Sequence, residues 1–185
     1  MKINFFKKLH STQQGFTLVE TLVAISIFTL SILSLMVILT KSIADTNYAK
    51  KKLVAGYLAQ EGIEYIRNMR DTYVVSSATG QIGWDAFNAL LVSSACNTAS
   101  GCYFNDAFSD YSTAVVACSN QGCPEILYES GQGRYGYTGS NSGYVRKITA
   151  TISTNQTKIF STVTWVQNSG TYSTTLAETV FNWAD

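Results

Sequence analysis

The sequence predicts an α+β protein in which a long N-terminal helix packs on a C-terminal antiparallel sheet. Three observations lead to this prediction. Residues 16–39 form an apolar run, residues 41–70 lack proline and carry an apolar stripe at helical spacing, and residues 144–183 alternate apolar with polar side chains. A chain of 185 residues has room for one core of ordinary size.

Residues 1–15 form a basic and polar leader. Lys2, Lys7, Lys8 and His10 lie before Gly15, and the rest of the chain has ten basic against twelve acidic residues, a formal charge of −2. Such a leader is typical of the start of an export signal, but no small-x-small cleavage site follows the apolar run. We therefore do not expect an ordinary secretory signal.

The apolar run over residues 16–39 is long enough to cross a membrane. At about 1.5 Å per residue, a helix of this length covers the roughly 30 Å of a hydrocarbon core. Glu20 is the only charged residue in the run. We predict a membrane-spanning half-helix over residues 16–40. Lysines lie on both sides of it, so charge does not define its orientation.

The second half of the helix is predicted to be amphipathic over residues 41–70. Val54, Leu58, Tyr65 and Met69 follow one another at spacings of four, seven and four, which places them on one helical face. The simplest prediction is one continuous helix from residue 16 to about residue 70. Its second half then packs on a globular head made of residues 71–185.

The head is predicted to contain three antiparallel strands near the C-terminus. Residues 144–153, 158–167 and 171–183 are rich in Val, Ile, Thr and aromatic residues, and short polar turns separate them. One apolar face of this sheet needs a cover, which the amphipathic half of the helix can supply. Residues 84–91 suggest a short helix, but the rest of residues 71–130 has no clear pattern. The expected inward-facing strand residues are Val145, Ile148, Ala150, Ile152, Ile159, Val163 and Trp165.

Four cysteines lie in a loop-like stretch of the head: Cys96, Cys102, Cys118 and Cys123. An even number in such a stretch, beyond a membrane segment, indicates two disulfides in an oxidising compartment and therefore a head outside the cytoplasm. Three pairings are possible. We favour Cys96 with Cys102 and Cys118 with Cys123, because short loops close most easily. A zinc site with four thiolates is the alternative, although such sites usually have tighter C-x2-C spacing.

The composition disfavours an enzyme and a nucleic-acid-binding protein. The formal net charge is only +1, which predicts no specific nucleic-acid site. Removal of the leader would take away the only histidine, and no serine lies in a G-x-S-x-G motif. We predict no catalytic residue and no cofactor. Carboxylate catalysis stays open in principle at three positions that nothing pairs: Asp85, Glu125 and Glu129.

A calcium site is a weak alternative in the loop "NDAFSD". Asn105, Asp106 and Asp110 could offer oxygen ligands, but the loop lacks the glycine-punctuated spacing of a calcium-binding loop. A solvated loop explains these residues better. We therefore predict no metal site.

Gly15 followed by "FTLVETLVA", after a short basic leader, resembles the type III signal of type IV pilins and pseudopilins. The resemblance is sharpest over residues 15–24, and the long helix supports it over residues 16–70. It implies a pilin-like fold with loops cross-linked by disulfides. It also implies that a prepilin peptidase cuts after Gly15 and methylates the new N-terminus at Phe16.

A role for Glu20 follows from this resemblance. A cut after Gly15 creates a positive amine on Phe16, which can pair with a carboxylate, and residues 16 and 20 are spaced i and i+4. In the family, this carboxylate is thought to neutralise the N-terminus of a neighbouring subunit as it joins the filament. Unpaired charges in a water-free bundle cost several kcal/mol, so the pairing would favour one register. The alternative is an interfacial polar residue of a plain signal anchor.

The resemblance predicts a structural subunit of an extracellular type IV pilus-type filament, and the size and loop content of the head predict a minor subunit. The implied partners are the prepilin peptidase, other pilin or pseudopilin subunits, an inner-membrane assembly platform and, before assembly, membrane lipid. The chain would first lie in the cytoplasmic membrane with its head outside, and later in a surface filament. The alternatives are a pseudopilin of a type II secretion or competence system, and a membrane-anchored binding protein that never polymerises.

Overall fold

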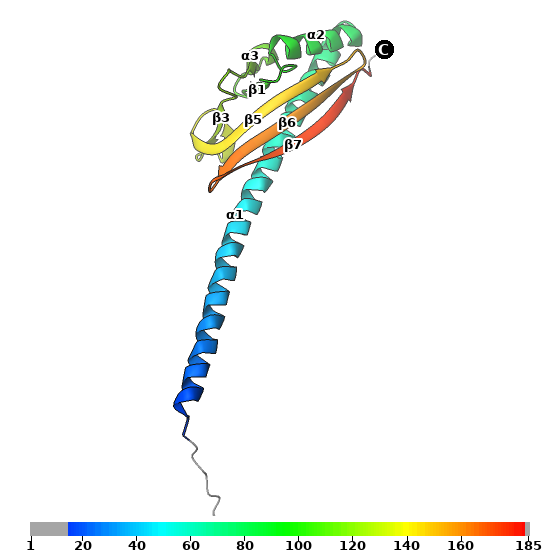
Figure 1. The fold of residues 1–185 in the computed structure, drawn as a ribbon. Helices are drawn as coiled ribbons and strands as arrows, with labels where there is room; N and C mark the ends of the chain where they lie inside the picture. The colour runs from blue at the N-terminus through cyan, green and yellow to red at the C-terminus, as the bar shows by residue number, and fades with distance from the viewer. Residues whose placement is uncertain (1–14, 184–185) are drawn as a thin grey trace, which may run out of the picture. The chain divides into compact units, whose positions relative to one another are not determined.

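A computed structural model describes residues 15–183 of the chain (Figure 1). Apart from Gly15, the predicted leader lies outside the described residues. The chain divides into one unit up to Thr46 and a second unit that begins at Asn47. The long helix α1 (Leu18–Ser76) supplies the first unit and continues into the second, where a sheet follows it. The α+β class with a long N-terminal helix and an antiparallel sheet is confirmed.

Helix α1 ends at Ser76, six residues beyond the predicted end near residue 70. Residues 72–75 are threonine, tyrosine and two valines, which favour a strand by propensity, but Val74 is buried on the helix. Tertiary burial therefore overrides local preference. The predicted short helix is confirmed as α2 (Gly80–Ser93), and Thr79 caps it by accepting a hydrogen bond from the Ile82 amide at 3.3 Å.

The C-terminal sheet is a meander of three long strands, as predicted. Strands β5 (Ser140–Ile152), β6 (Gln156–Gln167) and β7 (Gly170–Phe181) are joined by tight hairpins. The second hairpin places Asn168 in the left-handed region at a φ of 53°, which asparagine tolerates better than most residues.

Shorter elements extend the sheet along the other edge of β5. Strand β1 (Cys102–Phe104) pairs with β5 and with β2 (Val115–Ala117), while β3 (Glu125–Glu129) pairs with β5 and with β4 (Arg134–Gly136). The one-turn helix α3 (Tyr111–Ala114) precedes β2. Sequence patterns missed these strands because alternation over three to five residues is too short to recognise.

The core of the second unit lies between α1 and the sheet. Leu58 and Met69 of the predicted stripe are buried, and Val54 and Tyr65 are half-buried. One cluster joins Ile66 to Ile148 and Ile159, and the other joins Ala55 and Leu58 to Val163 and Trp165. The second half of the helix therefore covers the sheet, as its amphipathic pattern predicts.

The predicted inward position of Val145 is wrong. The buried face of β5 carries Tyr144, Arg146, Ile148 and Ala150, and side chains alternate between faces along a strand, so Val145 lies on the other face. The prediction chose valine for its hydrophobicity, whereas an arginine that is only 3% exposed takes the inward position. Its contacts are described below.

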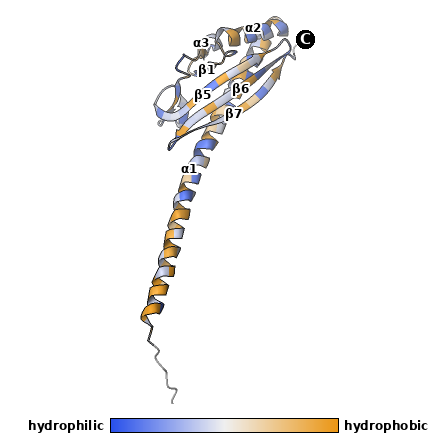
Figure 2. Ribbon diagram, viewed as in Figure 1, coloured by the Kyte–Doolittle hydropathy of each residue, from blue (hydrophilic) through white to orange (hydrophobic). Residues whose placement is uncertain are grey.

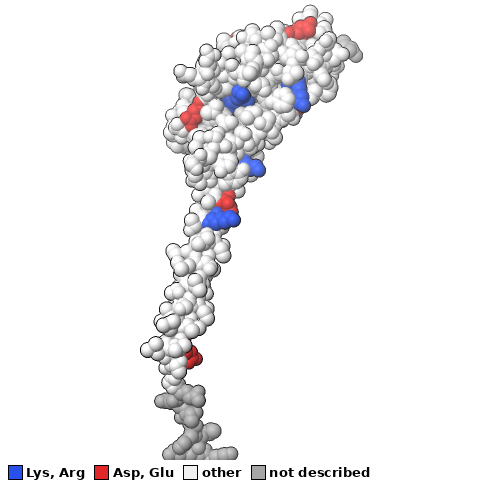
Figure 3. Space-filling model, viewed as in Figure 1, with Lys and Arg blue, Asp and Glu red and all other residues white. Residues whose placement is uncertain are grey.

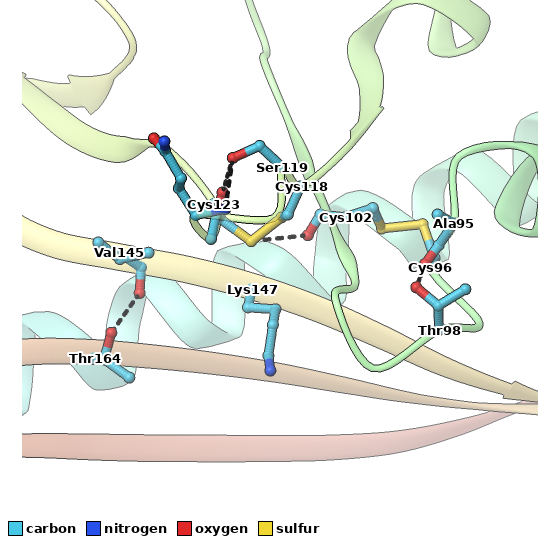
Figure 4. Close-up of a disulfide and its surroundings, with 12 residues drawn as sticks. Ala95, Cys96, Thr98, Cys102, Cys118, Ser119, Cys123, Val145, Lys147 and Thr164 are labelled. Atoms are coloured by element: carbon cyan, nitrogen blue, oxygen red, sulfur yellow. Dashed lines mark hydrogen bonds between the residues drawn. A yellow bond between two sulfur atoms is a disulfide. The ribbon is translucent and has the colours of Figure 1, made fainter.

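Both predicted disulfides are confirmed (Figure 4). Cys96 and Cys102 are completely buried, whereas Cys118 is 8% exposed and Cys123 is half-buried. All four sulfurs are in disulfides, so the alternative of a zinc site made of four thiolates does not apply. The first bridge ties the end of α2 to β1, and the second closes the loop between β2 and β3.

Candidate processing and assembly segment

The segment that joins the leader to α1 begins with three residues that precede the helix. Gly15, Phe16 and Thr17 are not helical, and α1 starts at Leu18. The Thr17 carbonyl accepts the amide of Thr21 at 3.2 Å, and its Oγ1 accepts the amide of Glu20 at 3.3 Å. Thr17 therefore caps the N-terminus of α1.

Thr17 and Glu20 have the spacing of a capping box, a motif that sequence reasoning missed. The signal was present as "TLVE", a threonine with a glutamate three residues later. Glu20 lies in the first turn, where the partial positive charge of the helix N-terminus favours a carboxylate. This local role is separate from any pairing with an amine.

The first part of α1 presents its apolar side chains on the surface. Within the described residues, one helix is long and apolar enough to cross a membrane, by length and composition, and its most apolar window has none of its residues buried. Figure 2 shows this part of α1 as predominantly hydrophobic, and Figure 3 shows it almost uncharged on the face in view. Phe16, which precedes α1, is 77% exposed, and Leu18, the first residue of α1, is 80% exposed.

The hydroxyl groups in this stretch are satisfied within the helix itself. Six of them donate to carbonyl oxygens three or four residues earlier, at 2.7 to 2.9 Å: Thr21, Ser26, Thr29, Ser31, Ser34 and Thr40. Such bonds remove the need for water around a hydroxyl in an apolar medium. Among the described residues, the Glu20 carboxylate has no partner, so it is the one polar side chain of residues 16–40 left to be satisfied.

Arg146 makes a buried polar contact between α1 and the sheet in the second unit, and sequence reasoning missed it. Its Nη1 donates to the Leu58 carbonyl at 3.2 Å and to Glu61 Oε2 at 2.6 Å, and its guanidinium lies 3.9 Å from the Phe104 ring centroid. These contacts compensate the cost of burying a cation. No sequence pattern marks a lone arginine inside an alternating strand as buried.

Gly62 lets α1 pass close to the strands at this point. A Cβ atom at residue 62 would overlap Ser161 Oγ and would lie 3.2 Å from Arg146 Cδ. Gly56, six residues earlier on the same helix, has no atom within 4 Å of the corresponding position. Packing therefore requires glycine at residue 62 but not at residue 56.

The weaker site candidates are engaged in local structure. The Asp110 carboxylate caps α3, accepting from the amide and the hydroxyl of Ser112 at 3.0 and 2.6 Å, and these hydrogen bonds lower its pKa. Asn105 Oδ1 accepts from the Ala107 amide at 3.1 Å. In residues 15–183, no group of three or more histidine, cysteine or acidic residues is arranged to hold a metal ion.

The three carboxylates considered for catalysis lie apart from one another. Asp85 accepts a hydrogen bond from Gln81 at 2.8 Å on α2. Glu125 on β3 accepts from the Gly143 amide and from Asn141, while Glu129 pairs with Arg134 at 2.9 Å. Each has its own local partner, and they form no acid–base pair with one another.

Residues 10–38 match the family model of the prokaryotic N-terminal methylation motif, the signal of type IV pilins and prepilins. The matched range contains Gly15, Phe16 and Glu20, together with most of the apolar stretch. The chain therefore combines a prepilin-type signal with a pilin-like α+β fold. No curated protein and no solved structure gives a significant match.

The motif supports a type IV pilin-like or pseudopilin subunit, which is a structural class rather than an enzyme class. It implies processing by a prepilin peptidase and assembly with other pilin subunits. The apolar first part of α1 fits a membrane-anchored pilin that later enters a surface filament.

Proposed function

We propose that this chain is a minor structural subunit of an extracellular type IV pilus-type filament. The observation that carries the proposal is the prepilin-type motif at residues 10–38, aligned with a capped helix whose only charge before residue 41 is Glu20. Filament subunits of this kind would pack their apolar helices side by side. The exposed apolar side chains and the internally satisfied hydroxyls suit a helix that exchanges lipid for neighbouring helices.

The processing step is a cut between Gly15 and Phe16. Both residues precede α1, so the bond lies outside the helical hydrogen-bond ladder. A side chain at residue 15 would meet no atom of residues 15–183 within 4 Å, and Gly15 does not have a positive φ. The described part of the fold therefore has no need of glycine here, which supports recognition by another protein, the prepilin peptidase.

The assembly step uses the amine that the cut creates. Methylation of Phe16 would keep this amine positively charged, and Glu20 is the one carboxylate in the apolar stretch. In a filament core without water, either charge alone costs several kcal/mol, whereas a hydrogen-bonded pair recovers much of that cost. We assign Glu20 to the N-terminal amine of a neighbouring subunit.

The chain would then have four functional parts. Residues 1–15 are removed, residues 16–40 occupy the membrane and later the filament core, residues 41–70 join this segment to the head, and residues 71–185 form the head outside the cytoplasm. The two disulfides support an oxidising compartment for the head. The inner-membrane assembly platform would extract the processed chain from lipid.

The assignment as a minor subunit rests on the head. Its two disulfide loops and short strands between α2 and β5 go beyond the three-stranded meander that covers α1. A pseudopilin of a type II secretion or competence system is the second candidate, since the same motif supports it. Deletion of the coding sequence followed by counts of surface filaments, secreted protein and DNA uptake distinguishes the systems.

Mass spectrometry of the mature protein tests the processing step. We expect a chain that starts at Phe16 and carries one N-terminal methyl group. Gly15→Val should leave the leader attached and the protein in the membrane, while Gly56→Val, a matched change outside the motif, should be cut normally. A functional chain that retains its leader would refute the proposal and favour a plain membrane anchor.

A further inference from the structure

A cleft of about 420 Å³ lies in the second unit where three parts of the chain meet. Helix α1 contributes Asn47, Lys50 and Lys51, the β4–β5 region contributes Tyr135 and Tyr144, and the β6–β7 hairpin contributes Asn168. The volume suits a ligand of one or two sugar rings. None of these residues belongs to the processing segment, so the cleft is independent of the function proposed above.

The cleft carries unbalanced positive charge. No carboxylate is among the residues that line it, and neither Lys50 nor Lys51 forms an ion pair with any described residue. Lys51 Nζ donates to the Val166 carbonyl at 2.9 Å, which holds the ammonium group at the cleft and leaves two of its donors free. This arrangement favours an anionic ligand.

Contacts between neighbouring elements hold the walls of the cleft. The Tyr144 hydroxyl donates to the Lys51 carbonyl at 3.2 Å, and the Tyr135 ring packs edge-on against Tyr144 with centroids 6.1 Å apart. Burial raises the pKa of both tyrosines, so both remain neutral hydrogen-bonding groups at ordinary pH. The hairpin holds Asn168 in its left-handed conformation, which fixes the backbone that carries its amide group.

We propose that this cleft binds an acidic sugar residue, such as a uronate. Its carboxylate would face Lys50 and Lys51, its hydroxyls would bond the amides of Asn47 and Asn168, and its ring would pack on Tyr135. Convergent amides beside aromatic walls are typical of sites for small polar ligands. An anionic lipid fits less well, because Val54 is the only aliphatic side chain in the lining and acyl chains would have no apolar path.

Titration of the full chain, held in a zwitterionic detergent, with sodium glucuronate tests this assignment. Amide chemical shifts should report saturable binding at millimolar concentrations, with shifts at Asn168 and Lys50. Glucose lacks the carboxylate, and inorganic phosphate lacks the sugar ring. Each should therefore bind at least tenfold more weakly than glucuronate.

Three single substitutions distinguish binding in the cleft from nonspecific attraction to positive charge. Lys50→Gln should weaken glucuronate binding about tenfold, because it removes one charge-assisted hydrogen bond. Lys52→Gln is the matched control: this lysine is also exposed, but it lines a different groove beside Leu53 and Gly56, so binding should not change. Asn168→Gly keeps the turn conformation, removes the amide and should weaken binding several-fold.

Three results would overturn the proposal. The first is the absence of saturable glucuronate binding to the unmodified chain. The second is an equal loss of binding in Lys50→Gln and Lys52→Gln, which would indicate nonspecific attraction. The third is binding of phosphatidylglycerol micelles that Lys50→Gln abolishes while glucuronate does not bind, which would assign the cleft to a lipid headgroup. None of these results bears on the cut after Gly15.

Discussion

The two parts of α1 satisfy their side chains in opposite ways. Over residues 18–46, hydroxyls bond to carbonyls of the same helix, and large apolar side chains are exposed. Over residues 47–76, side chains reach the strands instead: Lys51 bonds the Val166 carbonyl, Arg67 pairs with Glu178, and Arg70 bonds the Phe181 carbonyl. In the first part, the hydroxyl groups are hydrogen-bonded within the helix, but the apolar side chains have no surface of the described chain to pack on. In the second part, the sheet of the same chain provides that surface.

The two parts of α1 therefore contribute to different processes: the second part to folding of the chain, and the first part to packing against lipid or other helices. Packing in the second unit depends on contacts that are present in each folded chain. Packing of the first part depends on what surrounds it, whether lipid or other helices, because no described residue buries it. Substitutions in the first part should therefore alter assembly and leave folding intact, and substitutions in the second part should do the reverse.

Glu20→Gln should have the strongest effect, and it should act on assembly alone. The Thr17 hydroxyl accepts from the backbone amide of residue 20, which glutamine retains, so the change removes the charge and keeps the cap. The N-terminal amine of a neighbour would then be buried unpaired at a cost of several kcal/mol. We expect normal cleavage and nearly complete loss from sheared filaments, measured as the ratio of filament to membrane protein by immunoblot.

Thr17→Ala is the matched control for that change. It removes the hydroxyl that caps the helix and keeps the charge of Glu20, so it should cost about 1 kcal/mol of helix stability and retain most incorporation. Wild-type incorporation of the Glu20→Gln chain would contradict the pairing mechanism. Equal loss in both variants would instead show that incorporation depends on the helix cap as much as on the charge of Glu20.

Alkaline pH should destabilise the second unit and leave the first part of α1 folded. Burial raises the pKa of Tyr137 from 10.0 to about 12 despite the nearby Arg146, and burial raises that of Tyr65 from 10.0 to about 12. The folded chain therefore keeps protons that the unfolded chain loses, so stability is constant below about pH 10 and falls as the pH rises toward 12.

The first part of α1 has no tyrosine between residues 15 and 46. Near-UV circular dichroism, which reports packed aromatic rings, should therefore decline above about pH 10 before the far-UV helix signal does. The expected loss is about 2 kcal/mol for Tyr137. A helix signal that declines first would contradict this separation.

Gly62→Ala and Gly56→Ala should change stability in opposite directions. At residue 62 the new methyl group would overlap Ser161 and crowd Arg146, which should cost about 1 to 3 kcal/mol. At residue 56 it would meet no atom within 4 Å, and the higher helix propensity of alanine should add up to about 1 kcal/mol. Thermal unfolding of the two variants measures both effects, and equal shifts would show that helix packing at Gly62 is loose.

Ser34→Ala should have the smallest effect. The Ser34 hydroxyl bonds only to the Leu30 carbonyl, 2.8 Å away in its own helix, so its removal leaves no partner on another element unsatisfied. We expect a change within about 0.5 kcal/mol in unfolding and nearly normal incorporation. A large loss of incorporation would indicate that this hydroxyl contacts a neighbouring subunit.

Much of this architecture follows from the sequence alone because its causes are local and periodic. A long apolar run predicts the first part of α1, spacings of four and seven predict the face that Leu58 and Met69 bury, and strict alternation predicts β5 to β7. The disulfide pairing also follows, since short loops close at low entropic cost. The motif around Gly15 is a contiguous run, so no fold is needed to recognise it.

Only the tertiary structure decided the features that join distant residues. The burial of Arg146 depends on Glu61, the Leu58 carbonyl and Phe104 arriving together, and the helical state of Val74 depends on its burial. The cleft between Lys50, Tyr135 and Asn168 likewise exists only when three elements meet. The free energy of such contacts depends on residues that are far apart in the chain, whereas sequence patterns reflect only the conformational preferences of residues that are close in sequence.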